Sequence, residues 1–393
     1  MRRVSANYIY PVSGPPLKNG IVEFDTTGKI LNLIDTKGDL RETSGLEFYN
    51  GIITPGFVNA HCHLELSYMK NLIPDKCGLD QFVSHLTEIR TKSSHIISES
   101  IKNAHNEMIR NGIVAVGDIS NTSDSFEFKS GSKIKYHTFL EIFGRKPKNA
   151  AEIIQQAFDL SKLILEKFPH QHSIVPHSPY SVSAELLDKI NSLSDNNPVT
   201  IHNQESMGEI LLFKEKKGPL YEMLNRMVPE LKNWAPEKDN PLDFILANLN
   251  KSEKLLLVHN TYTIDKDIVR TKSYSGEIYW ILCPNANLYI EDKLPDIPMF
   301  LDENENIALG TDSLASNHNL SILEEMKTIT DYFPEVSLKE IIKWATLNGA
   351  RALNMDSELG SIEKNKNPGL NLISDLNLPE RKLTKNTRVI KIC

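Results

Sequence analysis

The chain has 393 residues, of which 40% are hydrophobic and 24% charged, so its composition is that of a globular protein rather than a disordered or fibrous one. Its 44 basic and 51 acidic residues give a formal net charge of −7, which argues against nucleic acid or a membrane surface as a partner. The four cysteines (Cys62, Cys77, Cys283, Cys393) form no C-x-x-C pair, so neither a disulfide framework nor a cysteine zinc site is indicated.

The first residues contain two arginines but no apolar stretch behind them, so they do not have the pattern of a signal peptide. No run of the sequence approaches the roughly 18 apolar residues that a membrane-spanning helix needs. We therefore expect a cytoplasmic protein.

Short β-type runs separated by turn residues make up the N-terminal segment. The expected strands are Ala6–Pro11, Gly20–Asp25 and Ile30–Thr36, with SGPP and TTGK as turns. The tail after Leu353 returns to short strands and turns. We expect residues 1–54 and 356–393 to form a small β-sandwich domain together.

Between residues 55 and 355, short apolar runs that end in polar residues alternate with longer helical stretches such as Ala150–Phe168 and Leu320–Phe333. This alternation predicts an α/β protein, a (β/α)₈ TIM barrel, with a helical insertion near residues 206–250 over its mouth. The eight expected strands are Ile53–Ala60, Val114–Ile119, Tyr136–Ile142, Gln171–Val175, Val199–Ile201, Leu255–Val258, Ile278–Leu282 and Ile307–Leu309.

Titratable residues follow several of these strands. Because the carboxyl ends of barrel strands meet on one face, where active sites are built, we expect these side chains to converge. They are His61, His63, His177, His202, Glu205, His259 and Asp312.

A His-x-His pair at a strand end presents two imidazoles to the same side, and therefore to one ion. His61 and His63 form such a pair, and His202 and Asp312 would add a third imidazole and a carboxylate. This mixture suits a catalytic Zn²⁺ or Fe²⁺ ion with an open position for water. The fourth strand offers no lysine to bridge two ions, so we expect one divalent ion, with Zn²⁺ preferred over Fe²⁺.

Three further roles follow from this hypothesis. Glu205, three residues after His202, is a candidate proton shuttle between the metal-bound water and the leaving ammonia. His259 could hydrogen-bond the attacking water, and Asp312 could act both as a ligand and as a base. The alternative for Glu205 is a solvated loop carboxylate.

The motifs resemble those of the amidohydrolase superfamily, in its chlorohydrolase and nucleoside-deaminase branch. The resemblance implies metal binding by His61, His63, His202 and Asp312, proton transfer by Glu205, and a water or substrate contact by His259. It also implies a substrate contact by His177. The segments that carry it are PGFVNAHCHLELS (55–67), PHSPYSVS (176–183), IHNQES (201–206), LVHNTY (257–262), CPNANLYI (283–290) and LGTDSLASN (309–317).

The segment HLELS and an arginine after the third strand are similar to those of aminodeoxyfutalosine deaminases of menaquinone synthesis. This similarity implies that a metal-bound hydroxide releases ammonia from a 6-amino purine nucleoside. Arg145 would then pair with the benzoate carboxylate of the substrate, and Glu65 would contact the ribose or the purine edge. A surface ion pair is the alternative for Arg145. Asn285 departs from the serine or arginine usual in this branch, which leaves the contacts from strand seven open.

Other substrates stay open. Relatives within the branch act on methylthioadenosine and S-adenosylhomocysteine, guanine, cytosine, triazines or pterins, and some release chloride. A non-enzymatic scaffold on the same fold is a further alternative, but every expected ligand is present.

Members of the superfamily commonly form homodimers, although nothing in the sequence locates an interface. Among the remaining histidines, His318 lies near enough to Asp312 to reach the mouth.

Overall fold

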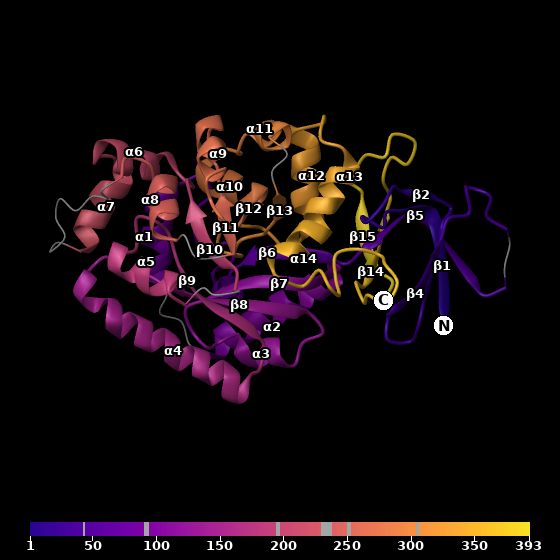
Figure 1. Ribbon diagram of the computed structural model, residues 1–393, viewed down its shortest axis with the longest axis horizontal. Coiled ribbons are helices and arrows are strands. Elements are labelled where there is room, and N and C mark those ends of the chain that lie inside the picture. The colour runs from indigo at the N-terminus through magenta and orange to yellow at the C-terminus, as the bar shows by residue number, and fades with distance from the viewer. Residues whose placement is uncertain (42–43, 90–93, 194–196, 229–237, 250–252, 304–305) are drawn as a thin grey trace.

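The computed structural model describes residues 1–41, 44–89, 94–193, 197–228, 238–249, 253–303 and 306–393. Figure 1 shows a body of parallel strands and surrounding helices, with an all-β part at one end. Both chain termini lie in that all-β part, so the chain leaves it once and returns to it at the end.

Eight parallel strands form the centre of the body, in two four-stranded sheets ordered β6-β7-β8-β9 and β10-β11-β12-β13. The sheets meet on both sides. Cys62 pairs with Asp312 as an isolated parallel bridge, and the His202 backbone N–H donates to the His177 carbonyl at 2.9 Å. The strands are β6 Phe57–Cys62, β7 Ile113–Ser120, β8 Lys135–Ile142, β9 Gln171–Pro176, β10 Val199–Asn203, β11 Lys254–His259, β12 Glu277–Leu282 and β13 Ile307–Leu309.

The eight strands lie where the apolar runs predict them, with one correction. The expected strand Ile53–Ala60 is two strands, because β5 ends at Pro55 in the all-β part and β6 begins at Phe57. Gly56 separates them. A Cβ there would lie 2.3 Å from a Val114 methyl carbon, so only glycine allows the chain to pass from one sheet to the other at this point.

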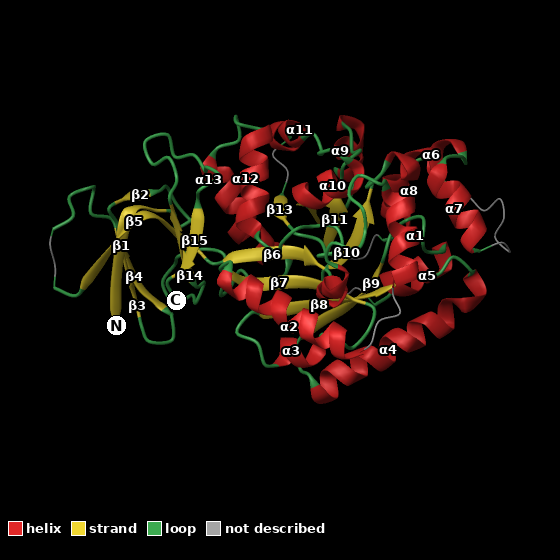
Figure 2. Cartoon of the chain, turned by 180° about the vertical axis from the view of Figure 1, so that it is seen from behind, coloured by secondary structure: helices red, strands yellow, loops and turns green. Residues whose placement is uncertain are grey.

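Helices surround the parallel strands (Figure 2). Between residues 206 and 250, the described residues form α6, α7 and α8; residues 229–237 and 250 of the expected insertion lie outside the described residues. The helices are η1 Leu64–Met69, α1 Leu79–Ile89, α2 Ser94–Arg110, α3 Phe126–Ser130, η2 Pro147–Asn149, α4 Ala150–Lys167, α5 Ala184–Asn191, α6 Met207–Glu215, α7 Pro219–Met227, α8 Pro241–Asn248, α9 Asp265–Thr271, α10 Pro284–Glu291, α11 Ile297–Asp302, α12 Ile322–Tyr332, α13 Leu338–Lys343, η4 Trp344–Asn348 and α14 Gly349–Ala352. Across the described ranges, no helix is both long and apolar enough to cross a membrane.

The all-β part is one seven-stranded sheet, ordered β15-β14-β5-β1-β3-β4, with β2 paired to β1. Both ends of the chain contribute strands to it. Most of its buried side chains, including Val4, Phe24 and Leu370, form a cluster separate from the core of the body, whereas Ile52 and Ile373 of the same sheet pack into the core of the body. The strands are β1 Arg2–Ile9, β2 Leu17–Lys18, β3 Ile21–Phe24, β4 Ile30–Ile34, β5 Leu46–Pro55, β14 Leu370–Ser374 and β15 Arg388–Lys391.

Candidate active site

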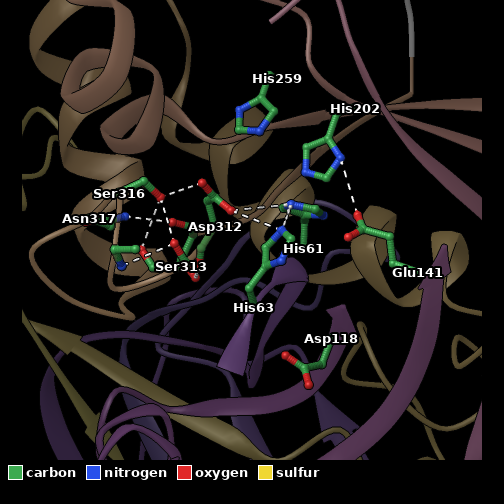
Figure 3. Close-up of polar contacts among 12 residues, drawn as sticks. His61, His63, Asp118, Glu141, His202, His259, Asp312, Ser313, Ser316 and Asn317 are labelled. Atoms are coloured by element: carbon green, nitrogen blue, oxygen red, sulfur yellow. Dashed lines mark hydrogen bonds and ion pairs between the residues drawn. The ribbon is translucent and has the colours of Figure 1, made fainter. Parts of the chain in front are cut away.

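The side chains at the carboxyl ends of β6 and β13 converge on one point (Figure 3). The Nε2 atoms of His61 and His63 are 3.2 Å apart, and the Asp312 Oδ1 lies 3.6 and 3.4 Å from them. Two nitrogens that bind one tetrahedral zinc ion at ~2.0–2.1 Å lie ~3.3 Å from each other. The spacing of this trio therefore fits three donors of a single ion.

Two further histidines extend the group. His61, His202 and His259 place ligand atoms within 4.8 Å of one another. The His202 Nδ1 lies 2.7 Å from the His177 carbonyl, and the His259 Nδ1 lies 2.8 Å from the Asn287 side-chain oxygen. Because both oxygens accept, each Nδ1 carries the proton, and each Nε2 keeps its lone pair.

The electrostatics of the cluster favour the forms that bind metal. Burial lowers the pKa of His63 and of His202 well below the usual histidine value, so the rings are neutral. Burial by itself raises the pKa of Asp312, but the adjacent His61 side chain outweighs it and holds that pKa well below its usual range. Neutral imidazoles and an anionic carboxylate are the species that coordinate a divalent ion.

Glu205 lies beside this cluster, in the loop after β10. Its side chain is buried, and its Oε1 lies 3.5 Å from the His259 Nε2. Burial, and then the charge of Asp312, raise the pKa of Glu205 well above its usual value. A carboxyl group with a raised pKa is suited to donate a proton to a substrate atom and to take it back.

The backbone at these strand exits is held in the left-handed region. The φ angles are 47° at Gln204, 72° at His259 and 56° at Asp312, which are uncommon values for residues other than glycine. Side-chain hydrogen bonds fix the last of these exits: the Asn59 amide donates to the Thr311 hydroxyl at 2.8 Å, and the Thr311 backbone N–H donates to the Asn59 oxygen at 3.0 Å. The site is therefore rigid in its backbone before any ligand binds.

A cavity of about 320 Å³ opens above the cluster. His63, His202, Glu205, His259 and Asp312 line its polar end. Its other end is largely apolar and lies between the helices α1 and α7. The apolar lining residues are Leu66, Leu79, Phe82, Val83, Leu86, Phe143, Tyr180, Met223, Leu224, Met227 and Val228.

Two residues predicted to contact substrate also line the cavity. His177 makes hydrogen bonds between its Nδ1 and the hydroxyls of Ser178 and Ser181, at 2.8 and 3.0 Å. Arg145 is buried and donates to the Leu224 carbonyl of α7 at 2.8 Å. Arg145 therefore lies in the wall of the cavity, as a substrate contact would require.

The structure places the other predicted contacts elsewhere. The Glu65 carboxylate accepts hydrogen bonds from the backbone N–H groups of Asn121 and Thr122, at 3.0–3.1 Å. Asn121 lines the cavity, whereas Glu65 is absent from its described lining. His318 is exposed and packs 5.5 Å from the Tyr289 ring, away from that lining. Asn285 donates to the buried Glu325 carboxylate instead of facing the cavity.

Sequence patterns missed several residues of the site and its surroundings. Glu141, near the end of β8, lines the cavity with its Oε1 3.7 Å from the His202 Nδ1. Asp118 in β7 and Lys129 in α3 form a buried ion pair near His63. A charged residue inside an otherwise apolar strand, as in KYHTFLEI and IVAVGDIS, is the signal that could have identified both carboxylates.

A model of the amidohydrolase family matches residues 52–392. The chain belongs to the amidohydrolase family. Among curated relatives, this amidohydrolase is 27% identical over 370 residues to the 5'-deoxyadenosine deaminase of Methanococcus vannielii, covering 88% of this chain and 80% of that protein.

Solved structures show the same fold. The Helicobacter pylori aminofutalosine deaminase in complex with methylthio-coformycin superposes with a TM-score of 0.79 at 23% identity, over 95% of this chain and 92% of that one. A zinc-bound adenosine deaminase from Xanthomonas campestris gives a TM-score of 0.71 at 20% identity, over 97% and 86%. The amidohydrolase thus has an α/β fold of the TIM-barrel type, with a histidine and carboxylate cluster that could hold a metal ion.

Proposed function

We propose that this amidohydrolase is a metal-dependent aminohydrolase that releases ammonia from the 6-amino group of a purine nucleoside. The observation that carries the proposal is the buried Glu205 carboxyl group, whose Oε1 lies 3.5 Å from the His259 Nε2 at the edge of the cluster and whose pKa burial raises well above its usual value. The names of the relatives, deaminases of 5'-deoxyadenosine and of aminofutalosine, support the same reaction.

In this proposal His61, His63, His202 and Asp312 hold one divalent ion, Zn²⁺ rather than Fe²⁺. The neutral rings of His63 and His202, the anionic carboxylate and the spacing of 3.2–3.6 Å among His61, His63 and Asp312 support this set. A bound zinc ion supplies Lewis-acid activation of a water molecule. We assign no second ion to the group Glu141, His177 and His202, because the His202 Nδ1 that faces Glu141 donates its proton to a carbonyl.

The chain's own residues then move the protons. Glu205 delivers a proton to the ring nitrogen next to the reacting carbon, which makes that carbon more electrophilic. It then takes up the proton of the hydroxyl group formed on that carbon and passes it to the departing amine, so that ammonia leaves; the proton that Asp312 receives from the water restores Glu205 at the end of the cycle. His259, oriented by Asn287, presents its Nε2 lone pair to the attacking water, and Asp312 acts as the base that receives the proton of this water.

The cavity supports a nucleoside with a substituent at the far end of the sugar. With the base at the polar end, near His177 and Glu205, such a substituent extends between α1 and α7 toward Arg145. Aminodeoxyfutalosine carries a benzoate there, which the guanidinium of Arg145 could bind. The alternatives are 5'-methylthioadenosine and S-adenosylhomocysteine, whose thioether also suits an apolar wall. Guanine, cytosine, triazine or pterin substrates, or chloride release, are the remaining alternatives.

We also propose that the eight parallel strands close into a (β/α)₈ barrel spanning residues 55–355. The Cys62–Asp312 bridge and the hydrogen bond between His202 and His177 support closure on both sides. Residues 1–54 and 356–393 would form the second domain, which their separate core supports; its arrangement as a β-sandwich stays a prediction. A homodimer and a cytoplasmic location also stay predictions.

The test is an assay of ammonia release by the zinc-loaded protein on aminodeoxyfutalosine, 5'-methylthioadenosine, S-adenosylhomocysteine, adenosine, guanine and cytosine. We expect release from adenine nucleosides with a 5' substituent and none from guanine or cytosine. Glu215→Gln, on the exposed end of α6, is the matched control for Glu205→Gln and should keep full activity. No release from any adenine nucleoside by protein that retains zinc would overturn the proposal.

A further inference from the structure

A buried ion pair lies next to the histidine cluster, on the outer side of the parallel strands. Lys129 of α3 and Asp118 of β7 have their charged atoms 2.5 Å apart, and both side chains are completely buried. The Lys129 ammonium also donates to the hydroxyls of Ser120 and Thr138, at 2.8 and 3.0 Å. These three contacts use all three of its N–H groups.

The second oxygen of Asp118 faces the histidine-bearing segment. Asp118 Oδ1 accepts a hydrogen bond from the backbone N–H of Leu64 at 2.7 Å. Leu64 directly follows His63, and Asp118 is paired with Cys62 in the sheet. The carboxylate thus connects α3 to the peptide on the far side of His63.

This contact falls where the regular backbone hydrogen bonds stop. The pairing of β6 with β7 ends at Cys62, and the helix η1 begins at Leu64. His63 has φ −120° and ψ 82°, and its side chain makes no capping hydrogen bond to η1. The first N–H groups of a helix need an acceptor from outside the helix. Asp118 supplies such an acceptor to the Leu64 N–H. This hydrogen bond fixes the direction of the backbone at His63, just after β6 ends.

Stability alone does not explain such a pair. Removing two charges from water costs so much that apolar side chains of similar shape often stabilise a protein equally well. An apolar pair would fill the space between α3 and β7, but it could not accept the Leu64 N–H. The acceptor at position 118, and not the packing, is the feature that an apolar pair would lose.

We propose that Asp118, held in its orientation by Lys129, is a positioning residue that holds His63 in place for the metal ion. The inference rests on the proposed metal-dependent function. It assigns a role to two residues that bind neither the ion nor the substrate. Its consequence is that the affinity for zinc depends on a hydrogen-bond acceptor at position 118.

The test compares two double variants that differ only in this acceptor. Asp118→Asn with Lys129→Met removes both charges but keeps a side-chain oxygen for the Leu64 N–H. Asp118→Leu with Lys129→Met has nearly the same shape and no acceptor. The zinc affinity of each protein is measured by competition with a chelator, and the melting temperature is measured on the metal-free proteins.

We expect the Asn double variant to bind zinc within about threefold of the wild type, and the Leu double variant to bind it about 10- to 100-fold more weakly. The melting temperatures of the two metal-free variants should be similar. Equal zinc affinity in both variants would overturn the inference while leaving the proposed function intact. A wild-type protein that binds no zinc would instead overturn both.

If the Leu double variant does not fold, Asp118→Ser with Lys129→Met takes its place. Its short hydroxyl leaves the Leu64 N–H out of reach but keeps the position polar, so the same loss of zinc affinity is expected. A Ser double variant with the affinity of the Asn double variant would overturn the inference.

Discussion

The buried carboxyl group of Glu209 leads to a prediction about how stability changes with pH. Glu209 lies in the first turn of α6, where one of its oxygens accepts a hydrogen bond from the Glu205 backbone N–H at 3.0 Å. Its other oxygen has no hydrogen-bond partner within the described part of the chain. Burial raises the pKa of Glu209 from 4.5 to about 8, although the backbone hydrogen bond from Glu205 acts in the opposite direction.

The sign of the effect follows from this shift. Because the carboxyl pKa is higher in the folded protein, its contribution to stability is fully present below pH 4.5 and is lost as the pH rises toward 8. At pH 7 the unfolded chain has released a proton that the folded protein still holds. At ~1.4 kcal/mol per pH unit, counted from pH 4.5 to pH 7, this difference lowers the free energy of unfolding by about 3 kcal/mol.

Glu209→Gln removes the titration but keeps an oxygen for the Glu205 N–H. We expect the variant to match the wild type near pH 4.5 and to exceed its free energy of unfolding by about 3 kcal/mol at pH 7. Urea unfolding of the metal-free proteins at several pH values between 5 and 8 measures the difference. Glu380→Gln, at an exposed position, is the control and should show no such trend. A difference that stays constant or shrinks as the pH rises would refute the reasoning.

Three further predictions concern the site itself. Glu205→Gln should lower kcat by about 10²- to 10⁴-fold while the zinc content stays at that of the wild type, as steady-state kinetics and metal analysis would show. Glu141→Gln should weaken zinc binding by about tenfold or more, because the His202 N–H loses a carboxylate neighbour 3.7 Å away; unchanged affinity in a chelator competition would contradict this. Gly310→Ala should lower both zinc affinity and melting temperature, because the new Cβ would lie 2.8 Å from the Cβ of His61.

Much of the fold follows from local patterns. Runs such as Leu255–Val258 are apolar throughout, because a strand that is covered on both faces needs no alternation of polar and apolar residues. Each of these runs is followed by a polar residue at the same edge of the sheet. The division at Gly56 was missed, although Pro55-Gly56 inside Ile53–Ala60 is a turn signal. The physical reason for the break is the Val114 side chain, distant in sequence, which leaves no room for a Cβ at position 56.

The site was predictable to the extent that its residues lie at strand exits. His61, His202 and Asp312 converge as their positions after parallel strands require. Glu65 was predicted to contact substrate, but the backbone of Asn121 and Thr122 turns toward it, and a sequence gives no indication of such a loop conformation. Glu141 belongs to a strand rather than to an exit motif, so no spacing rule identified it.

The hydrogen bonds between Asn59 and Thr311, 252 residues apart in the sequence, have a consequence for how the protein acquires its metal. The proposed ligands His61 and Asp312 come together only after the last parallel strand has been synthesised and has docked beside the first. A growing chain therefore lacks the complete set until synthesis is nearly finished, so an ion at the proposed site would bind only the folded protein. Such selective binding stabilises the folded protein by mass action, by ~2.7 kcal/mol at a free zinc concentration 100 times Kd. Zinc at the proposed site would thus join the first parallel strand, β6, to the last, β13.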